Sequence, residues 1–109
     1  MVGIDAVIES RARRALEVLG RSLKIVAAYV FGSHVDGTSD QWSDIDIAVF
    51  AEGVENWDIS KRAQTIARVQ KEAGDDIEVH LFSTESLERS DPASFAGWIL
   101  SRGIELSVK

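Results

Sequence analysis

Two aspartates separated by a single residue, Asp44 and Asp46, have the type and spacing best suited to chemistry in this sequence. In a strand, alternate side chains share a face, so both carboxylates would point one way while Ile45 and Ile47 point the other way. Two carboxylates this close repel each other unless a cation lies between them, and the segment 44–51 holds no Lys or Arg. The pair therefore predicts a divalent metal site, in which oxygen ligands favour Mg²⁺ or Mn²⁺. The alternative is that both aspartates decorate a solvated sheet face.

A glycine and a serine, Gly32 and Ser33, follow directly after the apolar run 24–31. Glycine lets the backbone approach a ligand closely. If a short helix begins at this point, its free N–H groups and the Ser33 hydroxyl form a phosphate-binding site. A phosphate site next to a pair of metal-binding acids indicates phosphoryl-type transfer.

A third acid is expected to complete a site for two metal ions, and the segment 76–82 supplies the candidates. Asp76, Glu78 and His80 share one face of this predicted strand by alternation. Glu78 is favoured because it lies in the middle of the strand. Asp76 is the less favoured alternative because, at the entrance of the strand, it could equally be a cap or turn residue. His80 is interpreted as a hydrogen-bonded packing residue rather than as a ligand or base.

Apolar periodicity and punctuation by Gly, Asp and Pro predict the elements that position these residues. Helices are expected over 4–19, from the N-cap Asp58 to Gly74, and from Pro92 in the first helical position through Leu100, with a short helical turn capped by Ser83 or Thr84. Strands are expected over 24–31, 44–51 and 76–82, with a further short one in 104–108. The order helix-strand-strand-helix-strand-helix predicts an α+β fold, with a small mixed sheet and helices packed against it in two layers around one core.

Composition narrows the function classes. The chain has 109 residues, and 12 Lys plus Arg against 18 Asp plus Glu give a net charge of −6, which argues against a stand-alone nucleic-acid clamp. The absence of Cys excludes thiol chemistry and Cys-ligated zinc. No apolar run is long enough for a membrane span, and the first residues do not resemble a signal peptide. These features indicate a soluble, cytoplasmic protein.

The pattern of Gly32-Ser33, ten further residues and then Asp44-Ile45-Asp46 resembles the signature of the minimal nucleotidyltransferases, a branch of the DNA polymerase β-like superfamily. The resemblance covers about residues 20–106 and extends to Gly37 and to the ending 103–106. It implies that residues 1–109 form a single minimal nucleotidyltransferase domain.

The resemblance also implies a role for each matching residue. Ser33 would contact the β- and γ-phosphates of a nucleoside triphosphate such as ATP, in a loop shaped by Gly32 and Gly37. Asp44 and Asp46 would hold Mg²⁺ (or Mn²⁺), with two ions in the site, and Glu78 would stand where the family has its third acid. The implied reaction is attack of an acceptor oxygen on the α-phosphorus, which releases pyrophosphate.

Many proteins of this family and size are antitoxins that pair with a helical HEPN ribonuclease toxin and add AMP to its tyrosine, so the resemblance implies such a partner. Two departures qualify the match. The family loop commonly reads Gly-Ser-Arg-Ala-Arg-Gly, whereas residues 32–37 here read Gly-Ser-His-Val-Asp-Gly, without either arginine. Triphosphate charge must then be met by metal, by backbone N–H groups, or by residues such as Lys61 and Arg62. The second departure is Glu78, in place of the usual Asp.

Three readings of function follow. The first is a metal-dependent transferase of AMP, whose acidic site repels nucleotide when no metal is bound. The second is a degenerate binding module that acts by contact with a helical partner, and the third is one half of a split aminoglycoside-type transferase. An oligomer is compatible with each of them. Trp42 could stack on a nucleobase or anchor its loop, whereas Phe95 and Trp98 are interpreted as core residues, and the basic run 10–14 as a solvated helix face.

Overall fold

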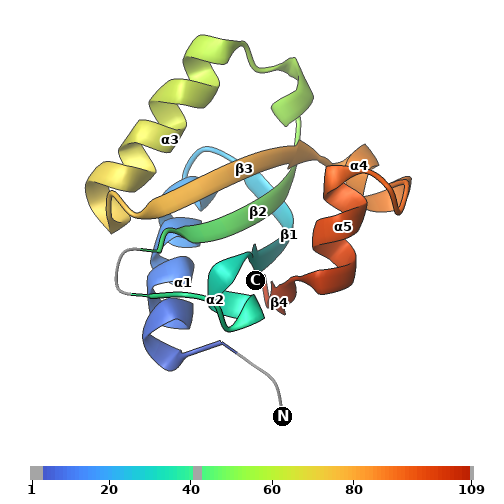
Figure 1. The fold of residues 1–109 in the computed structure, drawn as a ribbon. Helices are drawn as coiled ribbons and strands as arrows, with labels where there is room; N and C mark the ends of the chain where they lie inside the picture. The colour runs from blue at the N-terminus through green and yellow to red at the C-terminus, as the bar shows by residue number, and fades with distance from the viewer. Residues whose placement is uncertain (1–3, 41–42, 109) are drawn as a thin grey trace.

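The computed structural model describes residues 4–40 and 43–108, so Trp42 lies outside the described residues. In chain order the elements are α1 (Ala6–Gly20), β1 (Lys24–Phe31), α2 (Ser33–Asp36), β2 (Ile45–Glu52), the 3₁₀ turn η1 (Val54–Asn56), α3 (Ile59–Ala73), β3 (Ile77–Ser83), α4 (Thr84–Glu88), α5 (Phe95–Arg102) and β4 (Ile104–Leu106) (Figure 1). The expected α+β fold with a mixed sheet is confirmed.

The four strands form one sheet in the order β3-β2-β1-β4. β1 pairs antiparallel with β2 and with β4, whereas β2 and β3 are parallel because α3 connects them as a crossover. The parallel register places Asp46 directly beside Glu78. The antiparallel register places Phe31, the residue before Gly32, beside Asp46. Sheet pairing thus brings three separate stretches of sequence to one point.

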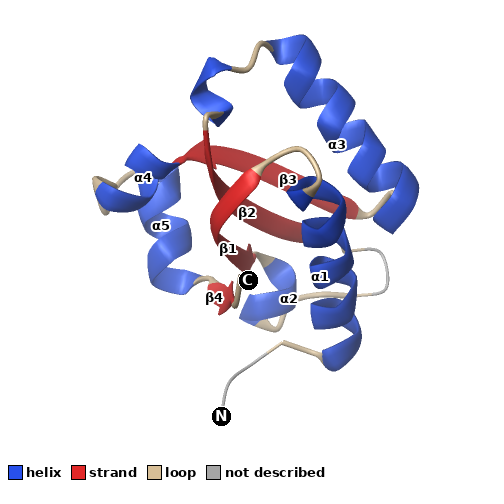
Figure 2. Cartoon of the chain, turned by 180° about the vertical axis from the view of Figure 1, so that it is seen from behind, coloured by secondary structure: helices blue, strands red, loops and turns tan. Residues whose placement is uncertain are grey.

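The two faces of the sheet are covered unequally. α1 and α3 cover one face, where the larger core contains Ile45 and Ile47 of β2. α5 packs on the opposite face against Ala48 and Phe50 (Figure 2). Since Asp46 alternates with the two isoleucines, it lies on the second face, next to the smaller core. Helices therefore cover both faces of the sheet, whereas the sequence predicts two layers. The second face carries the candidate site.

The last helix begins later than the sequence predicts. α5 starts at Phe95, and its N-cap is Ser94, whose hydroxyl accepts a hydrogen bond from Gly97 N at 3.0 Å. Pro92 belongs instead to the preceding turn, in which the Asp91 carboxylate accepts from Ala93 N at 2.8 Å. The prediction of Pro92 in the first helical position is therefore wrong, because the Asp91 turn satisfies these backbone groups without a helix.

Phe95 is not a core residue as predicted, because half of its surface is exposed. Its ring nevertheless contacts Phe31, His80 and Trp98 in edge-to-face or stacked arrangements. The exposed ring of Phe95 therefore lies at the edge of the smaller core, beside His80.

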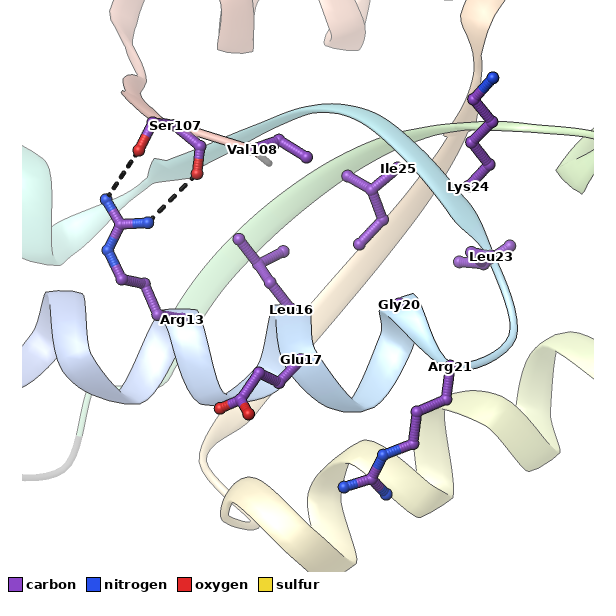
Figure 3. A pocket seen from close by; sticks show the side chains of 10 residues that line it. All are labelled: Arg13, Leu16, Glu17, Gly20, Arg21, Leu23, Lys24, Ile25, Ser107 and Val108. Atoms are coloured by element: carbon purple, nitrogen blue, oxygen red, sulfur yellow. Dashed lines mark hydrogen bonds between the residues drawn. The ribbon is translucent and has the colours of Figure 1, made fainter.

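No helix within residues 4–40 and 43–108 is long and apolar enough to cross a membrane. A groove of about 860 Å³ lies between α1 and the beginning of β1, beside the C-terminal residues Ser107 and Val108 (Figure 3). Lys24, which lines this groove, is at the opposite end of β1 from Phe31. The groove is therefore separate from the site described next.

Candidate metal centre

Three side chains on the second face of the sheet form a compact group. One ligand atom each from Asp46, Glu78 and His80 lies within 4.8 Å of the other two. Asp46 and Glu78 are neighbours in the β2–β3 register, and His80 lies two residues further along β3, beside Ala48. Because alanine has only a methyl group, the imidazole has room to lean toward the two carboxylates. The structure thus brings together two of the acids that the sequence singled out, together with a histidine.

The His80 imidazole points between the two acids without a hydrogen bond to either of them. Its Nε2 is 3.7 Å from Asp46 Oδ1 and 3.7 Å from Glu78 Oε1, which is too long for a hydrogen bond. This nitrogen is buried and has no hydrogen-bond partner among the described residues. The ring packs against Phe31 and Phe95, with centroid distances of 5.2 and 5.6 Å. The interpretation of His80 as a packing residue therefore holds for its ring, but the expected hydrogen bond is missing.

Gly32 lies against the Asp46 carboxylate. Its φ of 85° and ψ of −151° are essentially restricted to glycine, and a Cβ at this position would stand 2.5 Å from Asp46 Oδ2. The sequence suggested that this glycine makes room for a ligand. In the structure the group that approaches Gly32 is the carboxylate of Asp46. The turn at Gly32–Gly37, called the glycine turn below, therefore directly contacts the cluster of Asp46, Glu78 and His80, called the acid group below.

The short helix α2 begins at Ser33, immediately after this glycine. Val35 N and Asp36 N donate to the Gly32 carbonyl at 3.0 and 2.9 Å, and Gly37 ends the helix in the left-handed conformation. Among the described residues the Ser33 hydroxyl forms no hydrogen bond, so it is available to an external acceptor or donor. The short helix that the phosphate-binding interpretation requires is thus present directly after Gly32.

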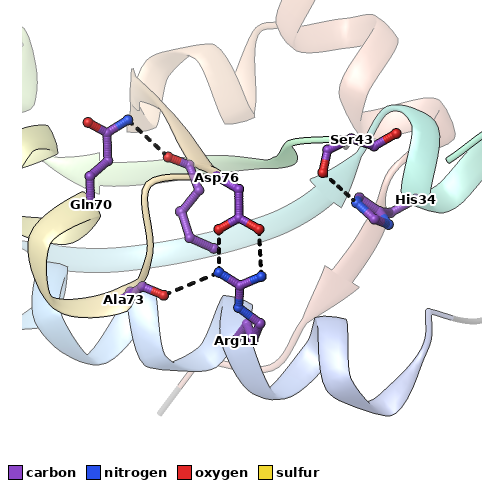
Figure 4. A network of polar contacts seen from close by, with 7 residues as sticks. Arg11, His34, Ser43, Gln70, Ala73 and Asp76 are labelled. Atoms are coloured by element: carbon purple, nitrogen blue, oxygen red, sulfur yellow. Dashed lines mark hydrogen bonds and ion pairs between the residues drawn. The ribbon is translucent and has the colours of Figure 1, made fainter. Parts of the chain in front are cut away.

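Asp44 lies outside the compact group of acids. It is exposed and directly precedes β2, whose first N–H, from Ile45, donates to the Asp76 carbonyl at 2.7 Å. The neighbouring Ser43 carbonyl lies 3.3 Å from His34 Nε2 of α2 (Figure 4). This contact ties the residue before Asp44 to the glycine turn.

Asp76, the alternative third acid, has a different partner. Both of its carboxylate oxygens accept hydrogen bonds from the Arg11 guanidinium of α1, with Nη1 to Oδ2 at 2.6 Å (Figure 4). These hydrogen bonds hold the pKa of Asp76 below its usual range. The pair joins α1 to the start of β3, so Arg11 does not lie on a freely solvated helix face as its run of basic residues indicated. The structure places Glu78, and not Asp76, beside Asp46.

Exchanging each of the two candidate acids for its amide separates their roles. Asp76→Asn is expected to lower the free energy of unfolding by about 1 kcal/mol, because it weakens a half-exposed, bidentate ion pair, and to leave metal affinity unchanged. Glu78→Gln is expected to lower metal affinity without that loss of stability. Thermal unfolding and calorimetric Mn²⁺ titration measure both effects. Loss of metal binding in Asp76→Asn alone would contradict the assignment of Glu78.

Electrostatics makes the metal-free acid group unfavourable. Burial raises the pKa of Asp46, and the neighbouring Glu78 carboxylate raises it further, while His80 opposes the shift. The folded protein therefore binds the Asp46 proton more tightly than the unfolded chain does. The contribution of Asp46 to stability is thus most favourable below the ordinary pKa of 3.8 and is lost as pH rises through the folded value.

The neutral variant Asp46→Asn is consequently expected to be more stable than wild type at neutral pH when no metal is present. A gain on the order of 1 kcal/mol corresponds to roughly 4–8 °C in melting temperature for a domain of this size. Melting curves in chelator at several pH values measure the difference between the two proteins. The difference should shrink as pH falls below 3.8, and an equal difference at every pH would argue against this titration.

The two cations suggested for the triphosphate are engaged at the other end of the strands. Arg62 donates to the Val54 carbonyl at 2.8 Å and to the Leu81 carbonyl at 3.5 Å. Lys61 Nζ lies 4.4 Å from the centre of the Trp57 ring. Neither side chain is therefore placed as a cation of the acid group in this conformation.

The donor set is suited to a divalent cation. Two carboxylates carry opposite charge to such an ion, and His80 Nε2 is a buried donor atom without a protein partner. Both are ligands that first-row divalent metals accept. The residues present therefore fit a metal ion.

Comparison with known proteins gives one family and one shared fold. The family model described as "Polymerase beta, Nucleotidyltransferase" matches residues 14–107. A crystal structure described as that of a "putative nucleotidyltransferase from Sulfolobus solfataricus" superposes with a TM-score of 0.59 at 20% identity, covering 76% of this chain and 73% of that one. This structural match shows a shared fold. The comparison with curated proteins gives no match.

Proposed function

Because the chain belongs to the polymerase β nucleotidyltransferase family, we propose that it transfers a nucleoside monophosphate, AMP from ATP, to an acceptor hydroxyl. The observation that carries this proposal is the contact between the glycine turn and the acid group. Gly32 lies against Asp46, Ser33 follows it as the first residue of α2, and Glu78 lies beside Asp46. A phosphate-binding turn next to metal-binding carboxylates is the equipment that phosphoryl-type transfer requires.

Each part of this arrangement has a role in the proposal. Asp46 and Glu78 hold Mg²⁺ or Mn²⁺, and Asp44, at the entrance of β2, completes a site for two ions. Such ions, when bound, neutralise triphosphate charge and activate the acceptor hydroxyl. The Ser33 hydroxyl and the N–H groups at the start of α2 bind the β- and γ-phosphates. Gly32 lets these groups lie close to the carboxylates because it has no side chain.

The reaction is a displacement at the α-phosphorus. The acceptor oxygen forms a bond to this phosphorus while the bond to the bridging oxygen of the β-phosphate breaks. Pyrophosphate leaves with the electron pair, and the proton of the acceptor hydroxyl passes to water. Asp46, Glu78 and His80 lie on the second face of the sheet, where Phe95 of α5 is half exposed. We propose a helical protein of the HEPN type as the acceptor, docking on this face beside Phe95.

The proposal is tested by incubation with ATP labelled on the α-phosphate, Mg²⁺ or Mn²⁺, and a HEPN-type helical protein encoded by a gene adjacent to that of this chain. Label is expected on the partner protein, and chelation with EDTA should abolish its transfer. The matched control is the double variant Asp44→Asn/Asp46→Asn. Transfer that persists unchanged in this variant would contradict the assignment of the metal ligands.

A second candidate function rests on two observations at the same site. Asp36 occupies one of the loop positions where the family commonly has arginine, and Asp44 lies outside the compact acid group. Both weaken the handling of a triphosphate and favour a module that binds its partner without catalysis. Tight complex formation with the neighbouring protein, without transfer of label to it, would favour this second function.

A further inference from the structure

The donor atoms around the candidate metal position include a nitrogen, Nε2 of His80, beside the oxygens of Asp46 and Glu78. We propose that His80 is a direct ligand, so that the site consists of two carboxylates and one imidazole and binds Mn²⁺, or another first-row divalent ion, more tightly than Mg²⁺. The inference rests on the proposed function, since it assumes that Asp46 and Glu78 hold the ion that transfer requires.

The distances at His80 are those of co-ligands rather than of hydrogen-bonded groups. Nε2 lies 3.7 Å from one oxygen of Asp46 and 3.7 Å from one oxygen of Glu78. Two ligand atoms that each lie about 2.1 Å from one ion are separated by roughly 3–4 Å, depending on the angle between them. The observed separations fall within this interval, whereas a direct hydrogen bond would need about 2.9 Å. His80 Nε2 is therefore already spaced to share one cation with each carboxylate.

The burial of the nitrogen gives a second, independent argument. A buried polar atom without a partner carries a desolvation cost, and native structures rarely leave one unexplained. His80 Nε2 is such an atom among the described residues. A cation between the carboxylates supplies the missing partner for Nε2 and removes the repulsion between Asp46 and Glu78.

Two aromatic neighbours pack against the imidazole. The centroids of Phe31 and Phe95 lie 5.2 and 5.6 Å from that of His80 and 5.7 Å from each other, so the three rings form one cluster. Packing of this kind limits ring rotation, so little side-chain entropy is lost when a ligand bond forms. An imidazole held in place in this way makes the site selective. Mg²⁺ prefers oxygen ligands, whereas first-row transition metals also accept imidazole nitrogen.

Pulsed EPR of bound Mn²⁺ tests the proposal on tag-free protein, because a directly bound imidazole gives a ¹⁴N coupling. The chain has two histidines, so His34→Ala is the matched control for His80→Ala. The coupling should be present in wild type and in His34→Ala and absent in His80→Ala. Mn²⁺ affinity, titrated by EPR, should fall in His80→Ala by about 10- to 100-fold, while Mg²⁺ affinity measured by calorimetry stays close to that of wild type.

A wild-type spectrum without ¹⁴N coupling, or a coupling retained in His80→Ala, would overturn the proposal. If His80→Ala does not fold, His80→Phe keeps a ring packed against Phe31 and Phe95 and removes the nitrogen, so the same spectra decide. The His80 ligand and the proposed nucleotidyl transfer can be refuted independently of each other. Transfer of label with no ¹⁴N coupling would refute the His80 ligand alone, whereas ¹⁴N coupling without transfer to any acceptor would refute the proposed function alone.

Discussion

Replacing Asp46 with Asn is expected to lower the rate of nucleotidyl transfer by roughly 100- to 1,000-fold and to abolish tight binding of divalent metal. The carboxylate touches all three parts of the candidate site. It is the register neighbour of Glu78, lies 3.7 Å from His80 Nε2 and stands against Gly32. An amide of the same shape keeps the packing and removes the charge. Metal ions contribute several kcal/mol to such reactions, and each 1.36 kcal/mol corresponds to a factor of ten in rate.

The matched control for this variant is Asp76→Asn, which makes the same exchange at an acid that pairs with Arg11. Steady-state transfer of labelled AMP and calorimetric Mn²⁺ titration should separate the two proteins. Misfolding does not account for the expected loss, because Asp46→Asn is expected to melt higher than wild type in chelator at neutral pH. Wild-type transfer by Asp46→Asn would show that this carboxylate does not hold the reactive metal.

Local signals in the sequence predict most of the elements but not how they meet. The apolar run of β1 is predicted at its observed bounds, Lys24–Phe31, because a buried strand is continuous in sequence. Side-chain alternation places Glu78 and His80 on one face of β3, as expected. The pairing of Asp46 with Glu78 depends on the register between two parallel strands, which tertiary packing sets and alternation alone does not fix.

Side-chain partners far apart in the sequence explain the remaining differences. Arg11 and Asp76 are 65 residues apart, and no local pattern shows that helix α1 delivers a guanidinium to the start of β3. His80 is likewise a lone histidine in the sequence, and its significance comes from two carboxylates and two aromatic rings that the fold places around it. Its position two residues after Glu78 predicts that the two side chains share a face, but it does not show that Asp46 lies beside them.

Gly32 is recognisable from the local sequence, but its contact with Asp46 comes from the fold. Gly32→Ala is expected to be the most disruptive single exchange in the glycine turn. The backbone conformation costs a residue with a side chain about 1–3 kcal/mol. The new Cβ would also stand 2.5 Å from Asp46 Oδ2, so the carboxylate must leave the position that it shares with Glu78 and His80. We expect a loss of stability of roughly 2–4 kcal/mol, measured by urea unfolding, and loss of tight Mn²⁺ binding.

Gly37→Ala is the control for the cost of placing a side chain on a backbone with positive φ. Gly37 also has a positive φ, 79°, but a Cβ there meets no atom within 4 Å. This variant should therefore lose only about 1 kcal/mol and keep its metal affinity. Equal losses of metal affinity in the two alanine variants would show that the conformation of the turn matters and that contact with Asp46 does not.

A double-mutant cycle isolates the contact between the glycine turn and the acid group. In an Asp46→Ala background the oxygen that blocks the new Cβ is gone, and the nearest remaining atom of residue 46 is its Cβ at 3.7 Å. Gly32→Ala should then cost about 1–2 kcal/mol less than in wild type, which is the coupling expected for residues in direct contact. If the stability losses of Gly32→Ala and Asp46→Ala simply add, the backbone of the turn shifts to avoid the clash and the carboxylate stays in place. In that case Gly32 would serve the conformation of the turn, and the position of Asp46 would be set by the strands alone.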